Sequence, residues 1–168
     1  MIVVTIAAIL ITIGAPALGE FMADQRVRTA ASDIAAEVSF ARAKAIENSR
    51  RAYIERTGAL WRNGWRVYVD LNNSGGFDAN EELKRFDGFP ATGTMYVCST
   101  VTDFATNVIF RPDGRVVRTV AAAATDGIYV VDTMGGGPVA KNKIRALQFG
   151  LSGRVTVVKL NGTVPPCT

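Results

Sequence analysis

The N-terminal stretch constrains the fold of this chain more than any other part. Residues Ile2 to Leu18 carry no charge, and from Ile2 to Ile13 a helix would be apolar on every face. Three interpretations compete: a secretory signal peptide cut near Ala15 to Ala17, a buried core helix, or a membrane span. A signal peptide normally has a basic segment first, and none precedes this run. As a helix the run would be roughly 26 Å long, just short of the ~30 Å hydrocarbon core of a bilayer.

The residues that follow favour the membrane span. Apolar positions recur with spacings of 4, 3, 4, 3 and 4, which is a helical stripe: Val27, Ala31, Ile34, Val38, Ala41 and Ala45. The charged positions between them predict a solvated face: Asp24, Arg26, Arg28, Asp33, Glu37, Arg42, Lys44 and Glu47. One helix is therefore predicted from Ile2 to about Ser49, roughly 70 Å long, with a bend near Gly14 and Pro16. Residues 1–19 form its transmembrane half and residues 20–51 its amphipathic half.

After Arg51 the hydrophobic period changes from 3.6 to 2, so residues 52–168 are predicted to form a β-rich head. In the segment from Trp65 to Leu71, alternate side chains indicate a half-buried strand. The predicted strands run over residues 51–58, 65–71, 95–98, 107–110, 115–120, 127–132, 143–149 and 154–160. Turn signals such as "RPDG" and "LSG" separate them. A long helix followed by short antiparallel strands is an α+β fold.

Composition argues against an enzyme. The chain has 168 residues, enough for one domain with a core, and it contains no histidine. Ser–His and Cys–His nucleophile schemes are therefore excluded, and zinc would need an unusual ligand set. No phosphate-binding glycine motif is present, and "MGGGPV" is better interpreted as a hairpin tip. We predict that the chain is not an enzyme.

An acidic stretch after the strand at Trp65 has the spacing of a calcium loop. Its polar residues occupy loop positions 1, 3, 5, 9 and 12, with Gly75 at position 6. They are Asp70, Asn72, Ser74, Asp78 and Glu81. A strand rather than a helix precedes the loop, so it is not part of an EF-hand pair. The alternative is a plain polar hairpin loop without metal. No other cofactor is expected.

The two cysteines are predicted to form a disulfide. Cys98 and Cys167 are the only cysteines, and bridging them would hold down the C-terminal tail. In the loop-entropy model, a disulfide that closes the loop from Cys98 to Cys167 would stabilise the fold by about 4 kcal/mol, less any strain. The alternative is two free thiols in a reducing compartment, which would contradict export.

Two sets of motifs resemble a known family. "MIVVTIAAILITIGAP" is similar to the N-terminal helix of the type IV pilin superfamily. In that family a leader, a cleavage glycine, a methylated phenylalanine and a helix glutamate come first. None of these is seen here, and we expect them to be encoded upstream of Met1. Within the head, "GWRVYVDLNNSGGFDANEELKRF", "VIFRPDGRV" and "FGLSGRVTV" resemble the pseudopilin H (GspH/FimT) domain.

The resemblance implies a pilin-like fold: a long N-terminal helix packed on antiparallel sheets. It also implies a minor pilin or pseudopilin, a structural and assembly subunit near the tip of a type IV pilus or type II secretion pseudopilus. The chain would cross the bacterial inner membrane once, with its head in the periplasm, before entering the filament. Its partners would be minor and major pilins or pseudopilins and the assembly platform. The membrane and assembly residues would be Ile2, Ile6, Ile9, Leu10, Ile13, Pro16 and Leu18.

The alternative function is DNA capture through the basic C-terminal third. Residues 111–168 hold eight basic and three acidic side chains, a net charge of +5. Some FimT-like pilins use a basic "G-R-x-R" near the C-terminus. Here the stretch is "GRVT", so Thr156 replaces the second arginine and the resemblance reaches Arg154 only. The candidate phosphate-binding residues are Lys141, Lys143, Arg145, Arg154 and Lys159. The alternative to DNA binding is that these charges simply form a solvated face of a sheet.

Overall fold

A computed structural model describes residues 2–90, 92–99, 101–118, 127–133 and 142–161; within these, side chains are described for residues 18–160. The helix is α1 (Ile2–Asn48), and three short 3-10 turns are η1 (Trp61–Asn63), η2 (Ala79–Glu81) and η3 (Thr102–Phe104). The strands are β1 (Ala52–Arg56), β2 (Trp65–Val69), β3 (Glu82–Phe86), β4 (Met95–Ser99), β5 (Asn107–Phe110), β6 (Gly127–Asp132), β7 (Lys143–Phe149) and β8 (Val155–Asn161). The predicted α+β architecture is confirmed.

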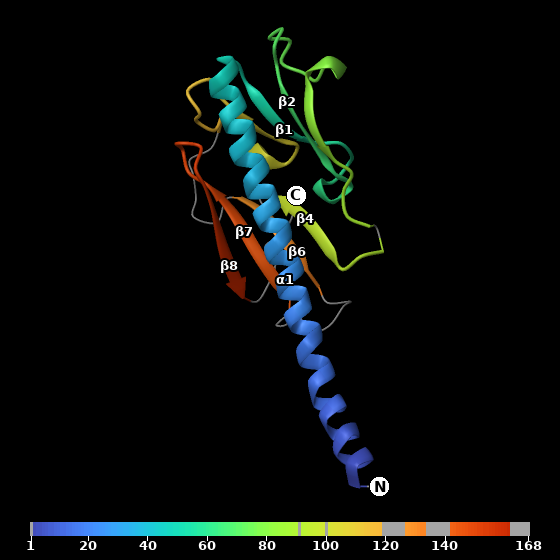
Figure 1. The fold of residues 1–168 in the computed structure, drawn as a ribbon. Coiled ribbons are helices and arrows are strands. Elements are labelled where there is room, and N and C mark those ends of the chain that lie inside the picture. The colour runs from blue at the N-terminus through green and yellow to red at the C-terminus, as the bar shows by residue number, and fades with distance from the viewer. Residues whose placement is uncertain (1, 91, 100, 119–126, 134–141, 162–168) are drawn as a thin grey trace.

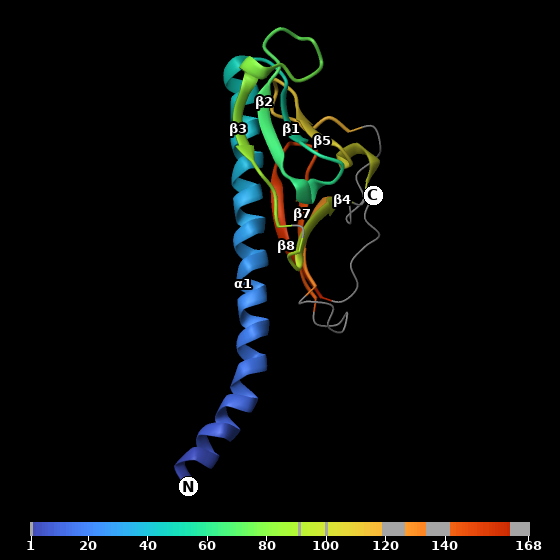
Figure 2. The same cartoon turned by 90° about the vertical axis from the view of Figure 1, so that its right-hand side faces the viewer.

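The helix ends in a left-handed cap. Ser49 adopts a φ of +51°. The Arg50 N–H then donates to the Ala45 carbonyl at 3.2 Å, and the Ser49 N–H donates to Ile46 at 3.2 Å. These bonds give partners to carbonyls at the end of the helix and turn the chain toward β1. Near the N-terminal end the axis bends (Figure 2), in the half of the helix where Gly14 and Pro16 predict a bend.

Two antiparallel sheets lie against one side of α1. Their strand orders are β3-β2-β1-β5 and β4-β6-β7-β8. The helix runs past both sheets, and its N-terminal part projects beyond the head (Figures 1 and 2). In Figure 2 the strands lie to one side of the helix, so the head is a helix layer on a sheet layer. All six residues of β6 are buried, so neither face of that strand meets solvent.

The core follows the predicted stripe on the helix. All six stripe residues are at most 5% exposed. They pack with side chains from both sheets, such as Trp65, Val108 and Ile128, in one hydrophobic cluster. Alanine at three of the six positions brings the helix backbone close to the strands. The prediction of the helix and its buried face is therefore confirmed.

Two of the predicted turns meet beside the helix. Gly114 and Gly153 have φ values of +77° and +78°. A Cβ on Gly153 would lie 2.0 Å from the carbonyl oxygen of Gly114, so only glycine fits there. Arg42 Nε donates to the same carbonyl at 3.0 Å. This contact holds the turn after β5, and with it the turn between β7 and β8, against α1.

Several local predictions were wrong. The strand expected at residues 115–120 is a single bridge between Phe110 and Val116, because the chain leaves the edge of the first sheet after the turn; residues 119 and 120 lie outside the described part. The strand β3 was not predicted, because its three central residues are exposed and two are charged. Glu37 was assigned to the solvated face but is 7% exposed. The segment from Trp65 was predicted to be half-buried, yet Tyr68 on its other face is 1% exposed.

The membrane assignment of residues 1–19 stays a prediction. Across the described residues, no helix is found with both the length and the apolar character that a membrane crossing requires. The side chains of residues 2–17, which carry most of the predicted span, lie outside the described part.

Enlarging a stripe alanine tests the close packing of α1. Ala41 is fully buried, so Ala41→Leu should lower the free energy of unfolding by about 1–3 kcal/mol through overpacking. Ala43 is exposed on the same helix, and Ala43→Leu should change it by less than about 0.5 kcal/mol. Denaturant unfolding measures both. Equal losses would show that the stripe does not set the packing.

Candidate functional site

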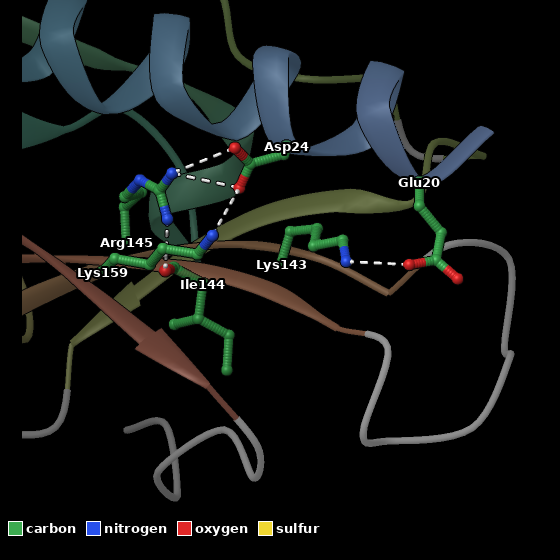
Figure 3. Close-up of polar contacts among 6 residues, drawn as sticks. All are labelled: Glu20, Asp24, Lys143, Ile144, Arg145 and Lys159. Atoms are coloured by element: carbon green, nitrogen blue, oxygen red, sulfur yellow. Dashed lines mark hydrogen bonds and ion pairs between the residues drawn. The ribbon is translucent and has the colours of Figure 1, made fainter. Parts of the chain in front are cut away.

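Ion pairs join the helix to the second sheet on the face that was predicted to bind DNA (Figure 3). Asp24 accepts two bonds from Arg145 Nη2, at 3.0 and 3.2 Å, and lies 3.8 Å from Lys159 Nζ. One helical turn earlier, Glu20 pairs with Lys143 at 3.3 Å. Arg26 adds a third contact, 2.8 Å from Asp132 on β6.

Simple periodicity places these charges. Glu20 and Asp24 are four residues apart, so they lie on one face of α1. Lys143 and Arg145 are two apart and therefore share a face of β7, and Arg145 stands opposite Lys159 in the β7–β8 register. The arrangement brings the two acids of the helix onto the three bases of the sheet.

Three of the predicted DNA-binding residues therefore already have acidic partners. The Arg145 side chain is 10% exposed, whereas Lys159 is 57% exposed and its amine can reach solvent. Arg154 lies apart from them in the exposed turn before β8. Lys141 lies outside the described residues. The side chains that were expected to form one patch are thus divided between an internal contact and an exposed turn.

A groove of about 660 Å³ runs between α1 and the β2–β3 pair. Its apolar wall includes Trp65, which stacks on Phe86 with ring centroids 4.2 Å apart. On the opposite side Glu37 accepts a hydrogen bond from the Trp65 indole and pairs with Lys84 at 3.0 Å. This role of Glu37 was not predicted, because its partners Trp65 and Lys84 lie on other elements of the fold. The groove offers an aromatic wall beside charged groups.

The acidic loop is ordered by its own side chains. Asp70 accepts the Ser74 N–H at 2.9 Å and the Gly75 N–H at 3.0 Å, one on each carboxylate oxygen. Asn72 donates to Asp78 at 2.7 Å. Glu81 accepts the Leu71 N–H at 2.8 Å. The structure thus brings the five predicted ligand residues into one bonded loop.

Those contacts do not yet form a metal site. In the part of the chain that the structure describes, no three His, Cys, Asp or Glu side chains are grouped so as to hold a metal ion. Calcium binding by the loop stays a prediction.

An aromatic contact seats the loop on the first sheet. Phe77 packs edge-on against Tyr68 with centroids 5.3 Å apart, and the Arg66 guanidinium lies 3.5 Å from the centre of the Phe77 ring. Tyr68 also stacks on Tyr53 at 4.8 Å. Burial raises the pKa of the Tyr68 hydroxyl above its ordinary value, and the Glu55 carboxylate raises it further. Tyr68 is therefore a neutral, buried platform for the loop.

The remaining predicted site residues are only partly described. Cys98 lies on β4 and is 8% exposed, but Cys167 is outside the described residues, so the disulfide stays a prediction. Of the membrane and assembly residues, Leu18 is the first whose side chain is described, and it is 62% exposed. Phe21 and Met22 follow it, 59% and 49% exposed. Spacings of three and four place these three apolar side chains on one side of α1.

Removing the Asp24 charge tests the helix–sheet contact. Asp24→Asn leaves the buried Arg145 guanidinium without its carboxylate, so the free energy of unfolding should fall by about 1–3 kcal/mol. Asp33 is exposed on the same helix, and Asp33→Asn should stay within about 0.5 kcal/mol of the unmodified chain. Denaturant unfolding compares them, and a neutral Asp24 variant would contradict the contact.

Comparisons with known proteins agree with this fold. The family model described as type II transport protein GspH matches residues 30–158. The crystal structure of the type IV minor pilin FimU from Pseudomonas aeruginosa (strain PAO1) is similar at 17% identity, with a TM-score of 0.56 over 86% of this chain and 99% of that one. A second crystal form of FimU gives 17% identity and a TM-score of 0.52, over 82% and 99%. No curated protein sequence matches. The predicted GspH/FimT resemblance is confirmed, and the chain belongs to the GspH family of type II transport proteins.

Proposed function

We propose that the chain is a minor pilin or pseudopilin, a structural and assembly subunit near the tip of a type IV pilus or type II secretion pseudopilus. Its membership in the GspH family and its FimU-like fold support the class of protein. The choice of filament, the tip position and the absence of enzymatic activity belong to this proposal.

The projecting end of α1 carries the proposal. Leu18, Phe21 and Met22 are about half exposed or more, and they neighbour Glu20 and Asp24, which pair with β7 and β8. Exposed apolar side chains gathered on one helix face are a liability for a protein that stays alone in water. Lipid or the helices of neighbouring subunits would cover them.

The proposed life of the protein has two stages. Residues 2–18 would first hold the chain in the bacterial inner membrane, with the head in the periplasm. The assembly platform would then transfer the subunit into the filament, where the same helix packs against other pilins or pseudopilins. Small residues such as Ala7, Ala8 and Gly14 would permit close approach of those helices.

DNA capture is a second candidate function. Its support is the exposure of Arg154 and of the Lys159 amine on the same sheet. The pairing of Lys143 and Arg145 with helix acids reduces the charge left for phosphate contacts. This function therefore rests on fewer residues than the sequence suggested.

A polar substitution on the projecting helix tests the assembly role. We expect Phe21→Ser to reduce filament incorporation and to restore piliation or secretion poorly in a deletion strain, while head stability is unchanged. Leu151→Ser is the matched control, because Leu151 is 64% exposed but lies in the β7–β8 turn. Filament yield and secreted protein are measured. A deletion strain with normal filaments and normal secretion would refute the proposed function.

Electrophoretic mobility shifts of duplex DNA test the second function with the full chain in detergent. The DNA proposal expects a shift at low salt that weakens as salt rises, and a weaker shift for Arg154→Ala. Arg28→Ala is the control, since Arg28 is exposed on the helix. If no shift occurs even at low salt, DNA capture by this chain is ruled out.

A further inference from the structure

The segment from Asp70 to Glu81, which runs from the end of β2 through η2, contains two buried carboxylates. It lies at the end of the head opposite the projecting N-terminus (Figures 1 and 2). Asp70 is 1% exposed and Glu81 is 2% exposed. Within the described part of the chain, neither forms an ion pair with a lysine or arginine. Buried carboxylates in proteins are normally paired with a cation or coordinate a metal.

One carboxylate oxygen of Glu81 indicates that the loop binds a further ligand. Glu81 Oε1 accepts N–H groups from Leu71 at 2.8 Å and from Asn72 at 3.3 Å. The carboxylate therefore reaches back to the start of the loop, next to Asp70. Its second oxygen, Oε2, is covered from solvent and has no hydrogen-bond partner among the described residues. This buried acceptor therefore needs a partner that the described residues do not supply.

We propose that this loop binds Ca²⁺ through the side-chain oxygens of Asp70, Asn72, Ser74, Asp78 and Glu81. The bound ion would supply the partner that Glu81 Oε2 lacks and would offset the charge of three carboxylates. All five donors are oxygens, which suits Ca²⁺ with its six to eight oxygen ligands and does not suit zinc. Gly75 at loop position 6 has a φ of +78°, so the chain can make the tight turn such a loop needs.

Binding would require a small change within the loop. Asp78 currently accepts hydrogen bonds from Asn72 at 2.7 Å and from Ser74 Oγ at 3.3 Å. The ion would replace those bonds and draw the Asp78 carboxylate toward Asp70 and Glu81. Because the site is not fully grouped beforehand, we expect a dissociation constant on the order of 10⁻⁴–10⁻³ M, as in extracellular calcium modules. The proposal does not rest on filament assembly, because the purified chain alone should bind.

Calorimetry on the full chain in detergent tests the site, with CaCl₂ as the titrant after removal of metal by a chelator. We expect saturable binding and a higher thermal unfolding midpoint in millimolar CaCl₂ than in the chelator. Asp78→Asn and Glu81→Gln should each weaken binding at least about tenfold, because each removes one charged ligand. Asp87→Asn is the matched control, since Asp87 is 92% exposed and pairs with Arg85 outside the loop; its affinity should be unchanged.

The outcomes decide between binding and a plain polar loop. Asp78→Asn keeps the test valid if Glu81→Gln fails to fold, because the Asp78 carboxylate is hydrogen-bonded to the exposed Asn72 and Ser74 side chains of the same loop. No saturable heat with the unmodified chain would overturn the proposal. So would unchanged affinity in Asp78→Asn, or an equal affinity for MgCl₂, which demands a stricter octahedral site.

Discussion

The close contact between α1 and the two sheets is the constraint on which the structure depends. Val27 and Val38, together with alanines such as Ala31 and Ala41, place the helix backbone near the strands. Neither sheet is broad, and the two share their hydrophobic core through the helix. A single amphipathic stripe therefore converts two small sheets into one head, and it also directs the rest of the helix away from that head.

Local periodicity made part of this architecture predictable. The stripe of α1 follows from its 3.6-residue period, and the strands β2, β5, β6 and β7 follow from short, mostly apolar segments between turn signals. The β3 strand was not predicted because its charged residues Lys84 and Arg85 are typical of a loop, and they form a strand only through pairing with β2. The burial of Glu37 was not predicted for a related reason. A carboxylate beside an apolar stripe is buried only if a donor such as the Trp65 indole faces it, and that depends on tertiary structure.

The candidate sites show the same division between local and distant information. The acidic loop is contiguous, so its spacing could single out five polar residues from the sequence alone. In the structure, hydrogen bonds link Asn72 to Asp78 and Glu81 to the Leu71 N–H, and calcium binding by these residues stays a proposal. The basic residues of the C-terminal third were correctly seen as a cluster in sequence. Their partners Glu20 and Asp24 lie more than a hundred positions away on the helix. No pattern within the basic segment could show that Lys143, Arg145 and Lys159 face these helix acids.

The position of the ion pairs affects how the protein would respond to mechanical traction. The ion pairs of Glu20 and Asp24 attach α1 to β7 at the N-terminal side of the head. The hydrogen bond from Arg42 to the Gly114 carbonyl attaches α1 again, about five turns further along the helix. A pull along the axis of α1 would therefore be shared as shear between two attachment levels instead of peeling one end first. Such a geometry suits a protein whose helix α1 is pulled along its axis while the head keeps its shape.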